Sequence, residues 1–498
     1  MPGRSSPEWE LFADWAGTLS DLAGTAGLLG WDRETLMPPA GAEGRARQLG
    51  TLAALHHREV VRPDAGAAIE ALQASGDDLD DDARAMLRLA VRERERALRV
   101  PEALVREITE ACSRCVSAWV EARAADDFAA YAGPLRRVVE LKRRQAEAIA
   151  IGDEPYDALL DEFEPGARAA DLEPVFAGLR ERLSPLVAAA AQREPVELPP
   201  RDWSEDGQMA LAHDIAGMVG FDETGGVIAR SAHPFTGSPH SGDVRFTTRL
   251  ARDSPLSNIG AVMHELGHAL YEQGLPAEVD RTPLHDAPSL GAHESQSRFW
   301  ENQIGHTGAF WSALEPALRR RFPEAMTGLD PALLHRAARV VRPSLIRVEA
   351  DEVTYNLHIV LRFEIELALM RGDLEVDDLP GAFADGMERL LGIRPPSDAL
   401  GVMQDIHWAD GLIGYFPTYT LGNLYAAQLA EAADETLGGI ERAVEDGRLL
   451  EVLAFMRDRV HRHGARLETR ELMRRATGQE LGPDALLTHL ERSYPAPG

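Results

Sequence analysis

Two histidines and a glutamate near the middle of the chain have the spacing of a zinc-binding helix. The segment reads His264-Glu265-Leu266-Gly267-His268. At about 100° per residue, side chains four positions apart project within roughly 40° of each other on an α-helix. Two imidazoles one turn apart can occupy two corners of a zinc tetrahedron, and the glutamate can act as a general base toward water. This pattern indicates metal-assisted hydrolysis.

The residues around the motif predict a well-bounded helix. Ser257 is a candidate N-cap, and Gly274 with Pro276 beyond it would end the helix. An apolar stripe on the opposite side is expected to face the core and to turn the two histidines toward a cleft. The stripe consists of Ile259, Val262, Met263, Leu266 and Leu270.

The third metal ligand must come from further along the chain. The metzincin extension would need Gly at 271 and His at 274, where this chain has Tyr271 and Gly274. Ser289 is a candidate cap for a second helix, and a carboxylate is the usual complement to two histidines. The candidates are His285, Asp286, His293, Glu294 and Glu301, of which Glu294 and Glu301 fit equally well.

The elements that must position these residues are mainly helical. Residues 7–220 show apolar residues recurring at three and four positions, which is typical of successive helices. One of these helices is expected to open at Asp80 and to stop at Pro101, with acids at its start and arginines at its end. Alternation over Asp243 to Leu250 predicts a strand, and helical periodicity returns after Ser254. The fold class is therefore mainly α with a small β-sheet near the middle of the chain.

Composition excludes several classes of partner. The 498 residues include 52 Lys+Arg and 81 Asp+Glu, a formal net charge of -29, which repels nucleic-acid phosphates and anionic membrane surfaces. We expect no nucleic-acid and no membrane partner. Two cysteines, Cys112 and Cys115, cannot form a disulfide framework and are expected to be structural. Without a visible signal peptide or membrane span, the chain is expected to be cytoplasmic.

The chain resembles the carboxypeptidase Taq family, thermostable zinc metallocarboxypeptidases found mainly in prokaryotes. The resemblance covers most of the chain. It rests on the following segments, in the family's order: Trp31-Asp32-x-x-Thr35-x-Met37-Pro38, His233-Pro234-Phe235, Asp243-x-Arg245-x-Thr247, His264-Glu265-x-x-His268, His293-Glu294-Ser295-Gln296, Ile346-Arg347-x-x-Ala350-Asp351 and Gly401-x-x-Gln404-Asp405-x-His407-Trp408.

The resemblance implies a function and a ligand set. Single amino acids would be released, with broad specificity, from the free C-terminus of peptides. The cofactor would be Zn²⁺, with Co²⁺ as a possible substitute, and its ligands would be His264, His268 and Glu294 rather than Glu301. The family also implies a large helical open-cleft metallopeptidase fold and a homodimer. Because the motifs must converge on one zinc, residues 1–498 are expected to form a single catalytic unit.

Further residues receive roles from the same comparison and from their chemistry. Glu265 is the expected general base. His407 and Tyr419 are expected to stabilise the oxyanion, as a His and a Tyr do in related helical oligopeptidases, with Tyr415 as the alternative. Arg347 is the expected clamp for the substrate carboxylate, because a guanidinium can bind it with two parallel hydrogen bonds. Arg347 would head a helical stretch over Val348 to Met370, and an ion pair with Asp351 is its alternative role.

Three residues of the strand region are candidate substrate-binding residues. Asp243 and Arg245 lie on one strand face with Thr247, which suggests a local polar network, and the strand could present its edge to an extended substrate. His233 is either structural or lines the cleft. His461 and His463 lie among charged residues and are expected to be solvated.

Two alternative functions remain from the sequence. A helical zinc oligopeptidase or dipeptidyl carboxypeptidase would use identical zinc chemistry, but an endopeptidase would tolerate an amidated substrate C-terminus. A non-catalytic peptide-binding zinc protein is the alternative outside enzymes. Glu265 argues against it, because a purely structural zinc site has no need of that carboxylate.

Overall fold

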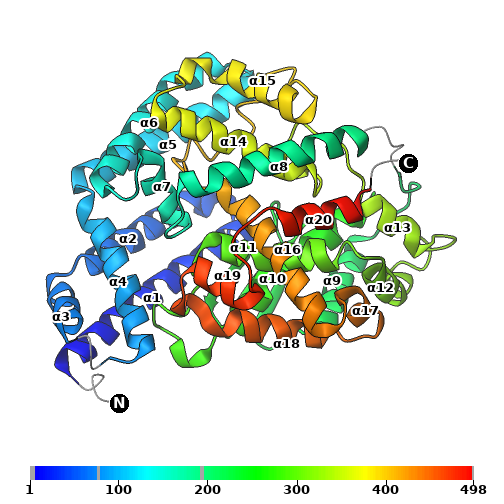
Figure 1. The fold of residues 1–498 in the computed structure, drawn as a ribbon, viewed down its shortest axis with the longest axis horizontal. Helices are drawn as coiled ribbons and strands as arrows, with labels where there is room; N and C mark the ends of the chain where they lie inside the picture. The colour runs from blue at the N-terminus through cyan, green and yellow to red at the C-terminus, as the bar shows by residue number, and fades with distance from the viewer. Residues whose placement is uncertain (1–5, 76–78, 191–195, 496–498) are drawn as a thin grey trace.

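Helices dominate the computed structural model, which describes residues 6–75, 79–190 and 196–495 (Figure 1). The first half contains α1 (Pro7–Thr35), η1 (Pro39–Gly41), α2 (Ala42–Val60), α3 (Pro63–Ala74), α4 (Asp81–Arg99), α5 (Glu102–Ala125), α6 (Phe128–Ile149), α7 (Pro155–Phe163), α8 (Ala169–Ala190), α9 (Glu205–Val219), β1 (Gly226–Arg230), β2 (Thr236–His240) and β3 (Asp243–Thr248). The expected mainly α fold with a small central sheet is confirmed.

The described residues after β3 form helices and connecting turns but no further strand. They contain α10 (Leu256–Gly274), η3 (Ala277–Val279), α11 (Leu290–Arg298), η4 (Phe299–Ile304), α12 (Gly308–Arg321), α13 (Pro331–Ala338), η5 (Arg347–Glu349), α14 (Thr354–Arg371), η6 (Val376–Asp378), α15 (Leu379–Leu391), α16 (Pro417–Leu437), α17 (Ile440–Glu445), α18 (Leu449–Arg459), η7 (His461–Arg466), α19 (Thr469–Thr477) and α20 (Asp484–Ser493). Here η4 is a π-helical turn that continues α11.

The buried apolar side chains form two clusters. A smaller one joins α1, α3 and α4 around Phe12, Trp15 and Met86. The helix expected to open at Asp80 is α4, and the Asp80 side chain caps it by accepting from the Ala83 N–H at 2.8 Å. The larger cluster gathers around α10, α11, α14 and α16, and Figure 1 shows α10, α11 and α16 together near the centre of the molecule.

The sheet order corrects one expectation. The strands lie in the order β1-β3-β2, with β3 parallel to β1 and antiparallel to β2. The strand predicted over 243–250 is therefore the central one, and both of its edges are already paired. It cannot offer an edge to an extended substrate, because that role is open only to an outer strand.

Helix α10 has the predicted faces but a different start. The five residues of its apolar stripe are all buried, whereas His264 and His268 are only partly buried. The two histidines therefore lie on the side of α10 that faces away from the apolar stripe, as predicted. The helix begins at Leu256 after Pro255, without a side-chain cap, so the prediction of Ser257 as N-cap was wrong. Gly274 ends the helix as predicted.

Two further observations concern the cysteines and the surface. Cys112 and Cys115 on α5 are both free and buried, as expected of structural cysteines, and burial raises the pKa of Cys115 to about 12.

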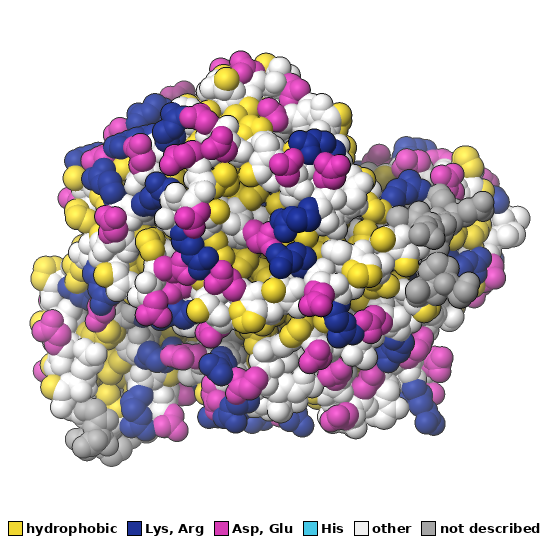
Figure 2. All heavy atoms as spheres, turned by 45° about the horizontal axis from the view of Figure 1, so that its top comes forward, with side chains coloured by type: hydrophobic (Ala, Val, Ile, Leu, Met, Phe, Trp, Pro, Cys, Tyr) yellow, Lys and Arg dark blue, Asp and Glu magenta, His cyan; other side chains and the backbone are white. Residues whose placement is uncertain are grey.

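Among the described residues, no helix combines the length and hydropathy needed to cross a bilayer. Figure 2 shows acidic and basic side chains interspersed over one face, where many can pair.

Candidate metal centre

Three side chains from two helices converge on one point. His264 and His268 extend from α10, and Glu294 extends from α11. The Glu294 Oε2 atom lies 3.6 Å from His264 Nε2 and 3.3 Å from His268 Nε2. All three potential ligand atoms lie within 4.8 Å of one another. Two imidazole nitrogens and one carboxylate oxygen form a donor set suited to a catalytic zinc ion.

Two glycines allow the helices to bring these ligands together. A Cβ at Gly267 on α10 would lie 2.5 Å from the backbone oxygen of Gln296, so only glycine permits this approach of α10 to α11. A Cβ at Gly422 on α16 would lie 2.4 Å from Glu294 Cγ. Both contacts are shorter than van der Waals separation. The close packing of three helices therefore sets the position of Glu294.

Glu301, the rival candidate for the third ligand, lies on the other side of His264. Its Oε2 accepts from His264 Nδ1 at 2.8 Å, whereas Nε2 of the same ring faces Glu294. Arg298 lies between the two carboxylates, with Nε 2.8 Å from Glu294 Oε1 and Nη1 3.1 Å from Glu301 Oε2. Glu301 thus orients a histidine, which is how carboxylates outside a metal's own ligand set usually act.

The other histidine is supported by ring stacking. The rings of His268 and His293 are stacked, with centroids 4.4 Å apart and planes 14° apart. Within the described residues, His268 Nδ1 has no hydrogen-bond partner. His293 Nε2 donates to Glu272 Oε1 at 2.8 Å. The two histidines of α10 are therefore held by different means.

The electrostatics of the cluster favour a cation. Burial opposes the charge on His264, but Glu294 and Glu301 outweigh burial and raise the pKa of His264 to about 9. Burial and the neighbouring His293 lower the pKa of His268 to about 4. Burial also opposes the charge on Glu294, yet Arg298 and His264 hold its pKa well below its usual range. A site that attracts a proton this strongly can exchange it for a divalent metal.

Glu265, the expected general base, is buried beside the cluster. Its side chain carboxylate accepts from the Thr236 hydroxyl at 2.7 Å, so strand β2 orients it. Burial raises the pKa of Glu265, while His264 and Thr236 act in the opposite direction. Sequence reasoning missed Thr236, although it follows the His233-Pro234-Phe235 segment directly.

Arg347 lies in a different environment from the one expected. It belongs to the short turn η5, and the following helix α14 begins only at Thr354. Its partner is Asp405, at 2.9 Å, and not Asp351, whose carboxylate binds backbone N–H groups including that of Thr354. The predicted alternative of an Arg347–Asp351 pair was therefore wrong. Arg347 also donates to the Tyr355 hydroxyl at 3.1 Å.

The loop before α16 brings His407 and Tyr419 together. His407 Nε2 and the Tyr419 hydroxyl lie 3.4 Å apart. The Arg347 guanidinium lies 5.0 Å from the centroid of the Tyr419 ring. Burial lowers the pKa of His407 to about 4, despite Asp405 nearby. Tyr415 packs edge-on against Tyr419, with centroids 5.5 Å apart. Arg347, His407 and Tyr419 are thus mutual neighbours.

Asp243, Arg245 and His233 lie with the sheet. Arg245 binds Asp243 with two hydrogen bonds, of 2.6 and 2.7 Å, which agrees with the predicted local network. Its guanidinium also lies 5.9 Å from the centroid of the Trp31 ring. His233 is exposed. The structure gives these three residues no direct contact with His264, His268 or Glu294 among the described interactions.

One expectation about solvated histidines was wrong. His461 is fully buried, and its Nε2 lies 3.0 Å from Gln296 Oε1. His463 is partly buried. Neighbouring charges in the sequence suggested solvent, but the turn η7 folds back against α10 and α11. Gln296 of the His-Glu-Ser-Gln segment therefore anchors the C-terminal part of the chain beside the candidate metal ligands.

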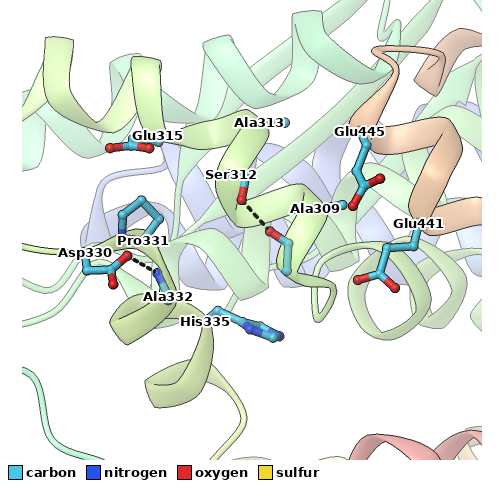
Figure 3. A pocket seen from close by; sticks show the side chains of 11 residues that line it. Ala309, Ser312, Ala313, Glu315, Asp330, Pro331, Ala332, His335, Glu441 and Glu445 are labelled. Carbon is cyan, nitrogen blue, oxygen red and sulfur yellow. Dashed lines mark hydrogen bonds between the residues drawn. The ribbon is translucent and has the colours of Figure 1, made fainter.

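One hollow of the molecule lies away from this centre. A pocket of about 630 Å³ lies between α12, α13 and α17 and is lined partly by Glu315, Asp330, His335 and Glu441 (Figure 3). Asp330 caps α13 through the Ala332 N–H, and Glu315 pairs with Arg319 at 2.6 Å. None of the predicted site residues lines it, whereas His264, His268 and Glu294 lie at the junction of α10 and α11.

Comparisons with known proteins match nearly the whole chain. Residues 12–494 match the family model described as carboxypeptidase Taq (M32) metallopeptidase. Thermostable carboxypeptidase 1 of Thermus thermophilus is 42% identical over 95% of this chain and 96% of its own. Carboxypeptidase 1 of Bacillus subtilis is 35% identical over 97% of both chains. The crystal structure of the M32 carboxypeptidase from Deinococcus radiodurans is 37% identical, with a TM-score of 0.95 over 98% of this chain and 99% of that chain.

Proposed function

The chain belongs to the carboxypeptidase Taq (M32) family and is a metallocarboxypeptidase, and from that premise we propose that it uses zinc to release single amino acids from peptide C-termini with broad specificity. The observation that carries the proposal is the convergence of His264, His268 and Glu294 within 4.8 Å. We assign these three residues as the zinc ligands. Cobalt is an expected substitute, because it accepts the same nitrogen and oxygen donors.

A bound zinc ion supplies Lewis-acid polarisation of the scissile carbonyl and lowers the pKa of water. Glu265 is positioned to take a proton from the attacking water and to deliver it to the leaving amine. The Thr236 hydroxyl fixes the carboxylate for this task by donating to Oε2. Because Glu265 and His264 are consecutive on α10, the helix fixes the position of the proposed base relative to the proposed ligand His264.

The remaining roles belong to the Arg347 neighbourhood. We assign His407 and Tyr419 as donors to the developing oxyanion, because they lie together and beside Arg347. We assign Arg347 to the substrate carboxylate, with Asp405 and Tyr355 holding the guanidinium in place. His233, Asp243 and Arg245 are proposed to bind more remote parts of the substrate, at the face of the sheet.

We also propose how the chain is organised into a catalytic unit, how it assembles and where it is located. We propose that the motifs from residue 233 to residue 408 act at a single centre and that residues 1–498 form one catalytic unit. We also propose a homodimer, which the family resemblance supports, and a cytoplasmic location.

A pair of blocked dipeptides tests the proposal. One ends in a free carboxylate and the other in an amide, and both are incubated with metal-free protein and with protein restored by zinc or cobalt. We expect the free C-terminal amino acid to appear only with metal and only from the first substrate. Equal cleavage of the amide would indicate an endopeptidase, and no release from either substrate would refute the proposal.

A further inference from the structure

Arg298 donates hydrogen bonds to both Glu294 and Glu301, and it contacts only one of the two Glu294 carboxylate oxygens among the interactions of the described residues. The Arg298 Nε atom donates to Oε1 at 2.8 Å. The other oxygen, Oε2, accepts from the Ser297 hydroxyl at 2.9 Å and faces the Nε2 atoms of His264 and His268. Oε2 therefore faces the point where the histidines converge, while Oε1 is bound by Arg298.

The same guanidinium also binds Glu301, the carboxylate that orients His264. Its Nη1 donates to Glu301 Oε2 at 3.1 Å, and that oxygen accepts from His264 Nδ1 at 2.8 Å. Glu294, Arg298 and Glu301 lie on one side of α11 and its π-helical continuation η4. The Arg298 side chain is only 15% exposed, and the guanidinium lies 4.7 Å from the centroid of the Tyr355 ring. Packing therefore restricts it to this position.

We propose that Arg298 is a positioning residue that makes Glu294 a one-oxygen metal ligand and keeps Glu301 against His264. A carboxylate near a metal can bind through one oxygen or both. Occupation of Oε1 by a charged donor favours the first mode and leaves one coordination position free for the reaction. This inference rests on the proposed metal site and concerns how that site is kept open.

Lysine cannot replace arginine in this role. An ammonium is a point donor, whereas the guanidinium fork contacts two carboxylates at once. Arg298→Lys keeps the positive charge that the buried carboxylates need, so it should fold. In Arg298→Lys, however, Oε1 is free to join Oε2 on the metal whenever the ammonium binds Glu301. Arg298→Met removes the donor entirely at similar length.

The test is the visible absorption spectrum of the cobalt-loaded protein, together with metal affinity measured by competition with a chelator. Cobalt with four ligands absorbs visible light more strongly than cobalt with five or six, so the spectrum reports the coordination number. For wild type we expect the strong four-ligand spectrum. Arg298→Lys and Arg298→Met should show weaker bands and an affinity lower by about 10- to 100-fold.

Glu301→Gln distinguishes the effect of Arg298 on Glu294 from its effect on Glu301. It disturbs only the support of His264, so affinity should fall while the strong spectrum stays. Circular dichroism checks the fold of each variant, and Arg298→Lys alone decides the matter if Arg298→Met does not fold. A wild-type spectrum and affinity in Arg298→Lys would overturn the role of Arg298. Equal loss of band intensity in Glu301→Gln would also overturn it. Wild-type protein that binds no cobalt would instead refute the metal site itself.

Discussion

At the scale of single residues, the proposed chemistry depends on Glu265, a carboxylate that we assign as the general base and not as a metal ligand. We expect Glu265→Gln to retain zinc, because His264, His268 and Glu294 are untouched, and to lose turnover by about 10²- to 10⁴-fold, the usual contribution of a general base. Zinc content and kcat on a blocked dipeptide measure the two effects. The matched control is Glu278→Gln, at a glutamate on η3 that is 73% exposed. Retained turnover in Glu265→Gln would remove the residue from the mechanism.

Arg347 permits a second residue-scale prediction. Because its guanidinium is held by Asp405 and Tyr355, Arg347→Lys should keep the charge but lose the paired contact with the substrate carboxylate. A hydrogen bond to a charged group contributes about 1.5–3 kcal/mol, so KM for a free-acid substrate should rise about 10- to 100-fold. Steady-state kinetics measure this change. A KM equal to that of wild type, in a variant with wild-type melting temperature, would show that the carboxylate binds elsewhere.

These residues also show what a sequence alone can establish. The two histidines and Glu265 could be identified because their relation is local to one helix turn. Glu294 and Glu301 could not be separated by periodicity, because residues seven apart lie on nearly the same helix face. Likewise, the partner of Arg347 is Asp405, 58 positions along the chain, and not Asp351 at helical spacing. Such pairings depend on tertiary packing, which local patterns do not contain.

At the scale of elements, the metal centre requires α10 and α11 to approach closely at Gly267. Gly267→Ala would place a Cβ 2.6 Å from Ser297 Cα as well as against Gln296. Overpacking of this kind costs about 1–3 kcal/mol, and displacement of α11 should also weaken metal binding through Glu294. Melting temperature and chelator competition measure the two effects.

The same helix provides the control. Gly260 also lies in α10, and among the described residues no heavy atom comes within 4 Å of its Cβ position. Gly260→Ala should therefore stabilise the protein, by up to about 1 kcal/mol, since alanine favours helix. If both alanine variants behaved alike, the approach at Gly267 would not be what positions α11.

The sheet shows the limit of element-scale prediction. Alternation in Asp243–Thr248 correctly indicated a strand, because the pattern reflects which side chains are buried. It contained no information on neighbours, and β3 proved to be central. The start of α10 was also misplaced, since Pro255 and not a side-chain cap precedes it.

At the scale of the whole molecule, a buried cluster ties the C-terminal helix to the segment before α14. Glu352 is 2% exposed at its side chain and accepts from His306, His489 and Tyr494 at 2.7–2.9 Å. Burial opposes ionisation, but His489 and His306 hold the pKa of Glu352 below its usual range. The pKa of His306 is raised by Glu352, against the effect of burial.

This cluster predicts a pH-dependent stability. A lowered glutamate pKa adds stability that is present above about pH 4.3, the unfolded value, and is lost as the pH falls through the folded pKa. A raised histidine pKa adds stability that is present below about pH 6.5 and is lost at higher pH. Glu352→Gln should therefore cost most, about 3 kcal/mol, between these values, and less in stronger acid.

Thermal melting from pH 7 to pH 3 measures the difference between Glu352→Gln and wild type. Glu349→Gln, at a neighbouring glutamate that is 57% exposed, is the control and should show almost no difference at any pH. A gap for Glu352→Gln that stays constant down to pH 3 would contradict the assignment of this cluster.

Net charge also acts on the whole molecule. A chain with a formal charge of -29 must attract a substrate carboxylate against its own field. Arg347 and Arg362 are buried near the site and Arg298 is partly buried there, and the three interact with Glu294, Glu301 and Asp405. We infer that the metal and these arginines together make the site locally positive in a chain whose net charge is negative.

A crystal structure of the zinc-loaded protein with a peptide analogue that resists hydrolysis tests the proposed metal centre and the role of Arg347 together. We expect zinc bound by His264 Nε2, His268 Nε2 and Glu294 Oε2, and the free carboxylate of the analogue against Arg347. Zinc bound by Glu301 would contradict the assignment of Glu294 as the third ligand, and a carboxylate held away from Arg347 would contradict the role of that arginine.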